Sequence, residues 1–257
     1  PLFKQSIDTR HVDRYSWNEP ARVNFGQGWA RRGAAELFRE VARIYPPLLP
    51  ICSTHSPQEE IARGSKPSLA EQRLHQSTVW LGNRPIYDDV NGGQVRVEMR
   101  ALPAGPTAVD MVANAAFLIG LAEGIRPQIS ELLPAIPFGI AEYNFYRAAQ
   151  HGLDARLVWP ELDQSGYQEK SICSIIERML PVAEAGLLAI GVDGAEAGHY
   201  LSVIEGRLAA RQNGAIWQQK KLAALQSKLP AEAALHKMLE AFIDHSEGNL
   251  PVAEWKL

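Results

Sequence analysis

The chain has 257 residues, of which 46% are hydrophobic and 21% charged, and its 26 Lys and Arg against 29 Asp and Glu give a formal net charge of -3. This composition suits a soluble globular chain with a sizeable core, and the charges form no long block of one sign. Nucleic-acid arms and basic membrane patches are therefore not expected, and small-molecule chemistry is favoured. Cys52 and Cys173 fit neither a disulfide framework nor a metal motif, so a reducing cytoplasm is the expected location.

Helical patterns and a short strand precede the middle of the chain. Residues 22–26 alternate like a strand, and residues 34–45 place their apolar side chains at helical spacing. Ser68, with Glu71 three residues later, has the form of a capping box. This signature predicts a helix that begins behind Ser68 and ends near residue 76.

A hairpin is expected next, with residues 78–87 and 94–102 as its strands and the turn-forming residues 88–93 between them. Side chains two residues apart on a strand point to the same side. The second strand thus has a charged face of Arg96, Glu98 and Arg100, and an apolar face of Val95, Val97, Met99 and Ala101. The apolar face is expected to pack and the charged face to meet a ligand; the alternative is a solvated strand whose charges bind nothing.

From residue 106 onward the pattern is almost wholly helical. Pro106 suits the start of a helix whose apolar run, residues 111–122, is shorter than a membrane span and is expected to be buried. The other predicted elements are a helix over 140–151 that closes at Gly152, an extended piece at 156–159, and helices near 168–190 with a break at Pro181, 194–211, 213–227 and 230–245. The expected architecture is α+β in a single domain over 1–257, with strands in 1–105 and mainly helices in 106–257.

Polar side chains of several types lie close to the charged face in sequence. They are His75, Thr78, Asn83 and Arg84 before it, and Asp110 and Asn114 on the following helix. A carboxylate on a rigid strand is a ligand that Mg²⁺ prefers, and guanidinium groups beside it can clamp a carboxylate or phosphate. The pattern therefore favours carboxylate or phosphoryl chemistry.

An ordered series of short motifs resembles one enzyme family. The motifs are His75-Gln-Ser-Thr78-Val-Trp80, Asn83-Arg84-Pro85, Val97-Glu98-Met99-Arg100, Leu102-Pro-Ala-Gly-Pro-Thr107, Ala113-Asn-Ala-Ala-Phe-Leu-Ile-Gly-Leu121, Asn144-Phe-Tyr-Arg147 with His151-Gly-Leu-Asp154, and Arg211-Gln-Asn-Gly214. Together they resemble the C-terminal half of the glutamate–cysteine ligase family of ATP-dependent carboxylate-amine ligases.

The resemblance implies a glutamine-synthetase-like α+β fold, ATP and Mg²⁺ as cofactors, and amide formation through a γ-glutamyl phosphate. Its substrates would be glutamate and an amine such as cysteine. By the same resemblance Glu98 would bind the metal ion, while Arg100 and Arg84 would clamp substrate or phosphate. Thr78 and His75 would make supporting polar contacts, and Arg147 would lie on an arginine-bearing helix that contributes to substrate binding.

The sequence also departs from that family. Its members begin with a strand of closely spaced glutamates that bind further Mg²⁺ ions, and no such strand is present in this sequence. Together with the opening Pro-Leu-Phe-Lys, which lacks a methionine, this predicts a processed product or a fragment without its N-terminal half. Little ligase activity is then expected from the chain alone, and either Lys4 or Arg10 could face the substrate.

A second hypothesis belongs to a different class. The chain could be a non-catalytic binding or assembly module whose helical second half forms a partner surface. An incomplete sheet would expose an edge, so homo-oligomers are also an open expectation. Convergence of Glu98, Arg100 and Arg84 in one pocket would favour the enzyme, whereas charges that point apart into solvent would favour the module.

Overall fold

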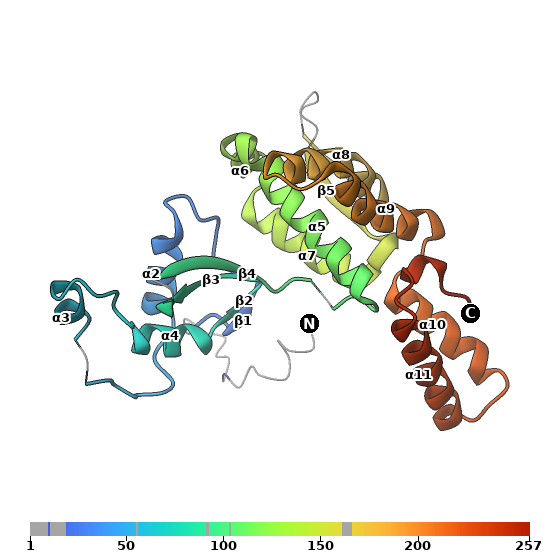
Figure 1. Cartoon of the computed structure of the whole chain (residues 1–257), viewed down its shortest axis with the longest axis horizontal. Coiled ribbons are helices and arrows are strands. Elements are labelled where there is room, and N and C mark those ends of the chain that lie inside the picture. Colours follow the sequence, from blue (N-terminus) through green and yellow to red (C-terminus); the bar gives the residue numbers. More distant parts are fainter. Residues whose placement is uncertain (1–9, 11–18, 55, 91–92, 103, 161–165) are drawn as a thin grey trace. The chain divides into compact units, whose positions relative to one another are not determined.

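The computed structural model describes residues 10, 19–54, 56–90, 93–102, 104–160 and 166–257. The chain divides into two compact units, Pro1–Pro103 and Ala104–Leu257 (Figure 1). Helices and small sheets occur together, so the prediction of a mixed α+β structure is confirmed. Each unit is described by itself below.

In its described residues, the first unit combines helices with two small sheets. Val23–Asn24 (β1) pairs in parallel with Trp80–Leu81 (β2), and Asn83–Asp88 (β3) pairs antiparallel with Gln94–Met99 (β4). The helices are α2 (Ala34–Ile44), α3 (Pro57–Ala62) and α4 (Ala70–Ser77). Their small core consists of Val41, Tyr45, Val79 and Leu81, with Ile44 packed against it. The helix predicted over residues 34–45 and the predicted hairpin are both confirmed.

The predicted cap of α4 is wrong. The residue that precedes the helix is Leu69, which has a φ of 45° and makes no side-chain cap hydrogen bond. The Ser68 backbone N–H donates instead to the Glu60 carboxylate at 2.9 Å, and the Glu71 carboxylate accepts from the backbone N–H of Ser53. Both capping-box residues are therefore engaged by other parts of the chain, which local sequence spacing does not reveal.

The second unit is mainly helical and also contains a hairpin. Its helices are α5 (Ala108–Ile125), α6 (Ile129–Ala135), α7 (Phe138–His151), α8 (Ile172–Ala189), α9 (Gly194–Ala210), α10 (Gly214–Gln226) and α11 (Ala231–Glu247). Short 3-10 turns, η2 (Arg126–Gln128), η3 (Gly152–Asp154) and η4 (Val252–Glu254), link or follow them. The hairpin consists of β5 (Arg156–Pro160) and β6 (Tyr167–Ser171).

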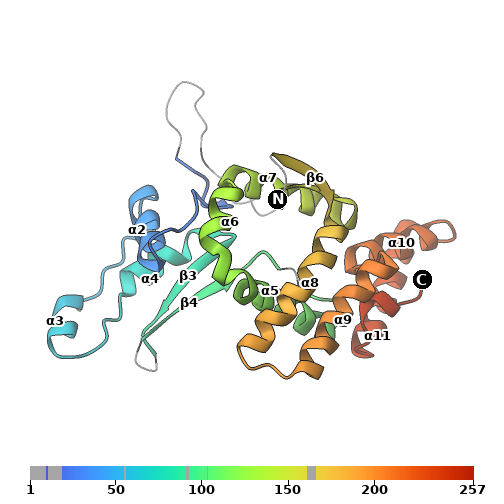
Figure 2. The same ribbon diagram turned by 90° about the horizontal axis from the view of Figure 1, so that it is seen from above.

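Helices α5, α8 and α9 form the main core of this unit (Figure 2). Glycines let α5 and α8 approach each other closely, because a Cβ on Gly186 would lie 2.6 Å from the backbone nitrogen of Gly124 and would also meet Gly120. A second cluster of Trp217, Val252 and Trp255 joins α10, α11 and η4. Its rings meet edge to face, with the Trp217 and Trp255 centroids 5.1 Å apart.

Three sequence expectations for this unit need correction. Residues 168–171 form part of strand β6 rather than a helix, because pairing with β5 outweighs the helical propensity of Gln168, Glu169 and Lys170. Helix α8 is continuous through Pro181, and its neighbours Ala183 and Gly186 are buried in the contact with α5. Helix α6 was not predicted at all.

The helix predicted from Pro106 to near residue 124 is confirmed as α5, but the expectation that its apolar run is buried holds only for one face. The helical stretch Ala108–Ala135 is long and apolar enough to cross a membrane by length and composition, and 17% of its most apolar window is buried. Met111, Val112 and Ile119 on α5 are between 43% and 47% exposed. Length and composition do not by themselves separate a spanning helix from a helix packed on one side, and α5 packs on α8 and α9.

Candidate functional site

The β3–β4 hairpin brings two of the predicted site residues directly opposite each other. Arg84 on β3 is the register partner of Glu98 on β4, so their side chains lie on the same face. The Arg84 Nε donates to Glu98 Oε2 at 2.6 Å, and the Arg100 Nε donates to the same oxygen at 2.6 Å. We call these three residues the Arg–Glu–Arg cluster.

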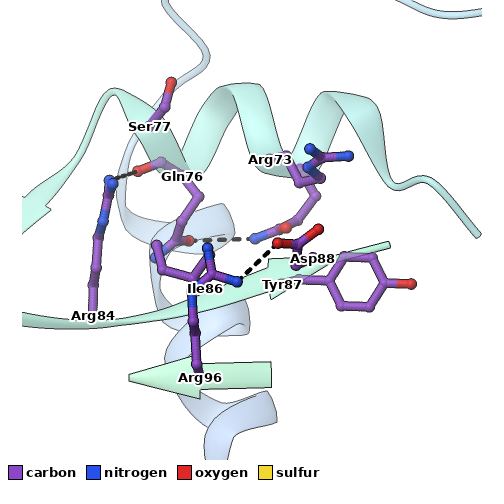
Figure 3. A pocket seen from close by; sticks show the side chains of 9 residues that line it. Arg73, Gln76, Ser77, Arg84, Ile86, Tyr87, Asp88 and Arg96 are labelled. Atoms are coloured by element: carbon purple, nitrogen blue, oxygen red, sulfur yellow. Dashed lines mark hydrogen bonds and ion pairs between the residues drawn. The ribbon is translucent and has the colours of Figure 1, made fainter. Parts of the chain in front are cut away.

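Backbone and helix contacts fix the two arginines. The backbone N–H of Arg100 donates to the Gly82 carbonyl at 3.0 Å, which extends the pairing of the two strands beyond Met99. The Arg84 Nη1 donates to the Gln76 carbonyl of α4 at 3.1 Å (Figure 3). The Arg84 side chain is 11% exposed, against 30% for Arg100 and 40% for Glu98. Arg84 is therefore the more rigidly held of the two guanidinium groups.

The cluster carries an excess of positive charge. Hydrogen bonds from Arg100 and, to a lesser degree, Arg84 lower the pKa of Glu98, while partial burial opposes this shift. Glu98 is thus ionised at neutral pH and balances one of the two guanidinium charges. Within the described chain, Arg84 Nη2 and both Nη atoms of Arg100 make no hydrogen bond. These donors can receive a carboxylate or phosphate group.

The structure does not place two further metal-binding side chains beside Glu98 among the described residues. No group of three or more His, Cys, Asp or Glu side chains that could hold a metal ion occurs among the described residues. The Oε2 atom of Glu98 already accepts two charge-assisted hydrogen bonds. Two guanidinium cations beside the Glu98 carboxylate make this face better suited to an anion than to a magnesium ion.

The structure places His75 and Thr78 in different surroundings from the cluster. His75 Nε2 lies 3.2 Å from the Val41 carbonyl of α2. Thr78 Oγ1 donates to the His75 carbonyl at 2.7 Å and accepts from Arg22 Nη1 at 2.9 Å. Both line a cavity of 440 Å³ together with residues of α2 and of the loop behind it. None of the three cluster residues lines that cavity.

Arg10 shares a second cavity with Thr78, whereas Lys4 lies outside the described residues. This cavity has a volume of 470 Å³ and is also lined by Arg22 and Tyr45. The Arg10 guanidinium donates to the Glu19 carbonyl. Burial raises the pKa of Tyr45, although hydrogen bonds from Asn24 and Gln27 oppose this.

The remaining candidates make their contacts within the second unit. Arg147 on α7 places Nη1 2.9 Å from His151 Nε2, and its guanidinium carbon lies 5.9 Å from the centroid of the Tyr143 ring. Asp110 and Asn114 both accept hydrogen bonds from Arg207, at 2.6 Å in each case for the shortest contact. Asp110 is fully buried and therefore serves the packing of this unit.

The prediction of which face of the hairpin packs and which face stays open is wrong. Val95 and Val97 are 53% and 58% exposed, so the apolar face does not pack. Helix α4 lies instead against the charged face, where it encloses a cavity with Arg84 and Arg96 (Figure 3). Gln76 in the wall of that cavity was missed, and its spacing of four residues from Gln72 was the available sequence signal.

Comparisons with models of protein families, with curated proteins and with solved structures find no match. The resemblance to carboxylate-amine ligases therefore depends on the sequence motifs alone.

Proposed function

We propose that this chain is part of an ATP-dependent carboxylate-amine ligase with a glutamine-synthetase-like fold, in which Arg84 and Arg100 bind the acidic groups of the substrates. One observation carries this proposal: a single carboxylate oxygen of Glu98 holds two guanidinium groups and leaves their Nη donors unengaged within the described residues, apart from the bond of Arg84 Nη1 to Gln76. Such an arrangement presents a fixed fork of donors to a planar carboxylate or a phosphoryl group.

The chemistry assigned to these residues is positioning and charge stabilisation. Arg84, fixed by Gln76 and Glu98, would orient the substrate carboxylate. Arg100, which is more exposed, would stabilise negative charge that develops as a phosphoryl group is transferred to that carboxylate. Glu98 keeps both guanidinium planes in place.

A ligase of this class requires ATP and Mg²⁺, with glutamate and an amine such as cysteine as its substrates. The ATP supplies the phosphoryl group that converts the carboxylate into an acyl phosphate. Because two guanidinium groups already engage the Glu98 carboxylate, we assign no step to the metal. The role of Glu98 in this scheme is to position Arg84 and Arg100.

The experiment is an assay of ATP-dependent amide formation by the natural protein that contains this chain, with glutamate and cysteine as substrates. Glu98→Gln should lower kcat/KM by about tenfold or more, since both arginines lose their charged anchor. The matched control is Glu240→Gln, because Glu240 is exposed and pairs with one lysine. Absence of amide formation with every amine tested would contradict the proposal.

A second candidate function is supported by one observation on α11. Leu235, Leu239 and Ile243 recur every four residues and are 48%, 52% and 45% exposed. An exposed apolar stripe of this kind suits a partner helix and would give the chain an assembly role. Analytical ultracentrifugation of Leu239→Glu tests this assembly role, with Leu188→Glu as the control. Loss of an oligomer in Leu239→Glu but not in Leu188→Glu would support the assembly role. A monomeric wild type would contradict it.

A further inference from the structure

A small cavity lies between α4 and the charged face of the β3–β4 hairpin. It has a volume of 180 Å³ (Figure 3). Its walls come from three elements: α4 contributes Gln72, Arg73, Gln76 and Ser77, β3 contributes Arg84, Ile86, Tyr87 and Asp88, and β4 contributes Arg96. Of these residues only Arg84 belongs also to the Arg–Glu–Arg cluster, so the cavity and the cluster share one guanidinium group.

Gln76 is the unusual residue of the cavity. It is 4% exposed, and its Nε2 atom has no hydrogen-bond partner among the described residues. Its amide oxygen is engaged, because the Gln72 Nε2 donates to it at 3.3 Å. A buried donor without an acceptor destabilises a folded chain, and such groups are rare in folded proteins. In Figure 3 the Gln76 side chain extends from α4 toward the hairpin, into the region that the other lining residues surround.

The polar groups of the lining indicate which kind of acceptor would satisfy Gln76. Three arginines and one aspartate line the cavity. Asp88 is already engaged, since it accepts from Arg96 Nη1 at 2.9 Å and from the backbone N–H of Val90 at 3.1 Å. Arg73 pairs with Asp89 at 2.7 Å, whereas Arg84 keeps its Nη2 donor. Each of the three lining arginines has a carboxylate partner, since Arg96 pairs with Asp88 and Arg84 with Glu98. The lining still keeps unused donors on Gln76 Nε2 and Arg84 Nη2, and such donors can recognise an oxyanion.

Size limits the ligand to a small group. A volume of 180 Å³ is below the usual range of drug-sized and cofactor pockets, which begin at about 300 Å³. A carboxylate or a phosphate group is small enough, and its several oxygens could accept from Gln76 and from two arginines at once.

We propose that this cavity binds the carboxylate or phosphate group of a small molecule, with Gln76 Nε2 and the guanidinium groups of Arg84 and Arg96 as its hydrogen-bond donors. Binding here requires neither ATP nor turnover, although the Arg84 Nη2 donor is shared with the proposed ligase site. It would remain if the chain proved to have no ligase activity.

The test is a titration of the ¹⁵N-labelled chain, followed through the side-chain amide resonances of its glutamines. Inorganic phosphate is used in one series and sodium glutamate in the other, so that the two sources of an oxyanion are distinguished. The Gln76 resonance should move with one of them and saturate with a Kd of about 1 mM or below. If neither anion moves that resonance, the proposal is overturned.

Gln76→Leu removes the donor without changing the charge of the cavity. It should weaken binding by about tenfold, as expected for the loss of one charge-assisted hydrogen bond, when binding to both proteins is followed through the side-chain amide of Gln72, which also lines the cavity. Because it also removes an unsatisfied buried amide, it should leave the melting temperature in the absence of anion unchanged or raised. Gln150→Leu, at an exposed position on α7, is the matched control and should bind as the wild type does. If Gln76→Leu binds the anion with wild-type affinity, the anion is held only by general electrostatic attraction to the arginines, and the proposal is overturned.

A second variant covers the case in which Gln76→Leu fails to fold. Arg96 is 54% exposed, so Arg96→Gln should fold normally. It should weaken anion binding by about tenfold, whereas Arg63→Gln, which removes an exposed charge at the end of α3, should not. Equal affinities in both arginine variants would place the anion elsewhere and contradict the assignment.

Discussion

Replacement of Asp110 by alanine should destabilise the second unit more than any surface substitution. The Asp110 side chain is fully buried, and both of its oxygens are used. Oδ1 accepts from Arg207 at 2.6 Å and 3.1 Å, and Oδ2 accepts from Thr107 Oγ1 at 2.8 Å and from the backbone N–H of Val252 at 3.0 Å. This carboxylate therefore joins the start of α5 to α9 and to η4.

The expected loss follows from what Asp110→Ala leaves behind. The Arg207 side chain is 13% exposed and would keep its charge without a carboxylate, while the donors of Thr107 and Val252 would lose their acceptor. Removal of one partner from a buried ion pair lowers the free energy of unfolding by about 3–5 kcal/mol. Removal of both partners, in Asp110→Ala combined with Arg207→Met, should lower it by less than the sum of the single losses, because no unpaired charge remains.

Urea unfolding followed by circular dichroism measures these losses. The control is Glu240→Ala, which breaks the exposed pair of Lys237 and Glu240 and should change the free energy of unfolding far less than Asp110→Ala does. A loss below about 1 kcal/mol for Asp110→Ala would refute the reasoning, because it would mean that the buried carboxylate contributes no more than a surface charge.

Three further predictions concern helix contacts and the hairpin. Gly186→Ala should lower the free energy of unfolding by about 1–3 kcal/mol or more, because its Cβ would meet the backbone of α5 at Gly124 and Gly120. Urea unfolding measures this loss, and an unchanged free energy of unfolding would argue against the close approach of the two helices. In Gly198→Ala on α9, the new Cβ would have no atom within 4 Å, so this substitution should raise the free energy of unfolding by about 0.5–1 kcal/mol. A lower free energy of unfolding in this variant would contradict the prediction. The lowered pKa of Glu98 means that its pairing stabilises the folded state fully above the ordinary value of 4.5 and progressively less as the pH falls through the lower folded pKa. The difference in free energy of unfolding between wild type and Glu98→Gln should therefore be largest at neutral pH and shrink toward pH 3. Because Glu98 is 40% exposed, this difference should remain below about 1 kcal/mol. A difference that grows on acidification would contradict the prediction.

The sequence predicted local structure well where the signal was local. Alternating residues around a turn of Asp and Gly types gave the β3–β4 hairpin, and Gly152, with a φ of 53°, ends α7 as expected. Strand β6 escaped prediction because Gln168, Glu169 and Lys170 favour helices, and only pairing with β5 makes them extended. Local propensity cannot reveal such a partner.

The candidate site was predictable in part for the same reason. Once the hairpin is aligned, the register places Arg84 opposite Glu98, and the alternation adds Arg100 on the same face. The choice of which face is covered was wrong, because the position of α4 depends on tertiary packing and not on the strand pattern. The burial of Gln76 has the same origin: its spacing of four residues from Gln72 indicated a side-chain pair on one helix face, but not that this face would be covered.

The most direct test of the ligase proposal is to trap the acyl phosphate. Hydroxylamine reacts with an acyl phosphate to give a hydroxamate and phosphate, so it reports carboxylate activation without knowledge of the natural amine. With ATP, Mg²⁺ and glutamate, the natural protein that contains this chain should form the hydroxamate. Arg100→Gln should reduce its rate by about a hundredfold, and Arg63→Gln should leave it unchanged. No hydroxamate from the wild type, or an undiminished rate in Arg100→Gln, would contradict the proposed role of the Arg–Glu–Arg cluster.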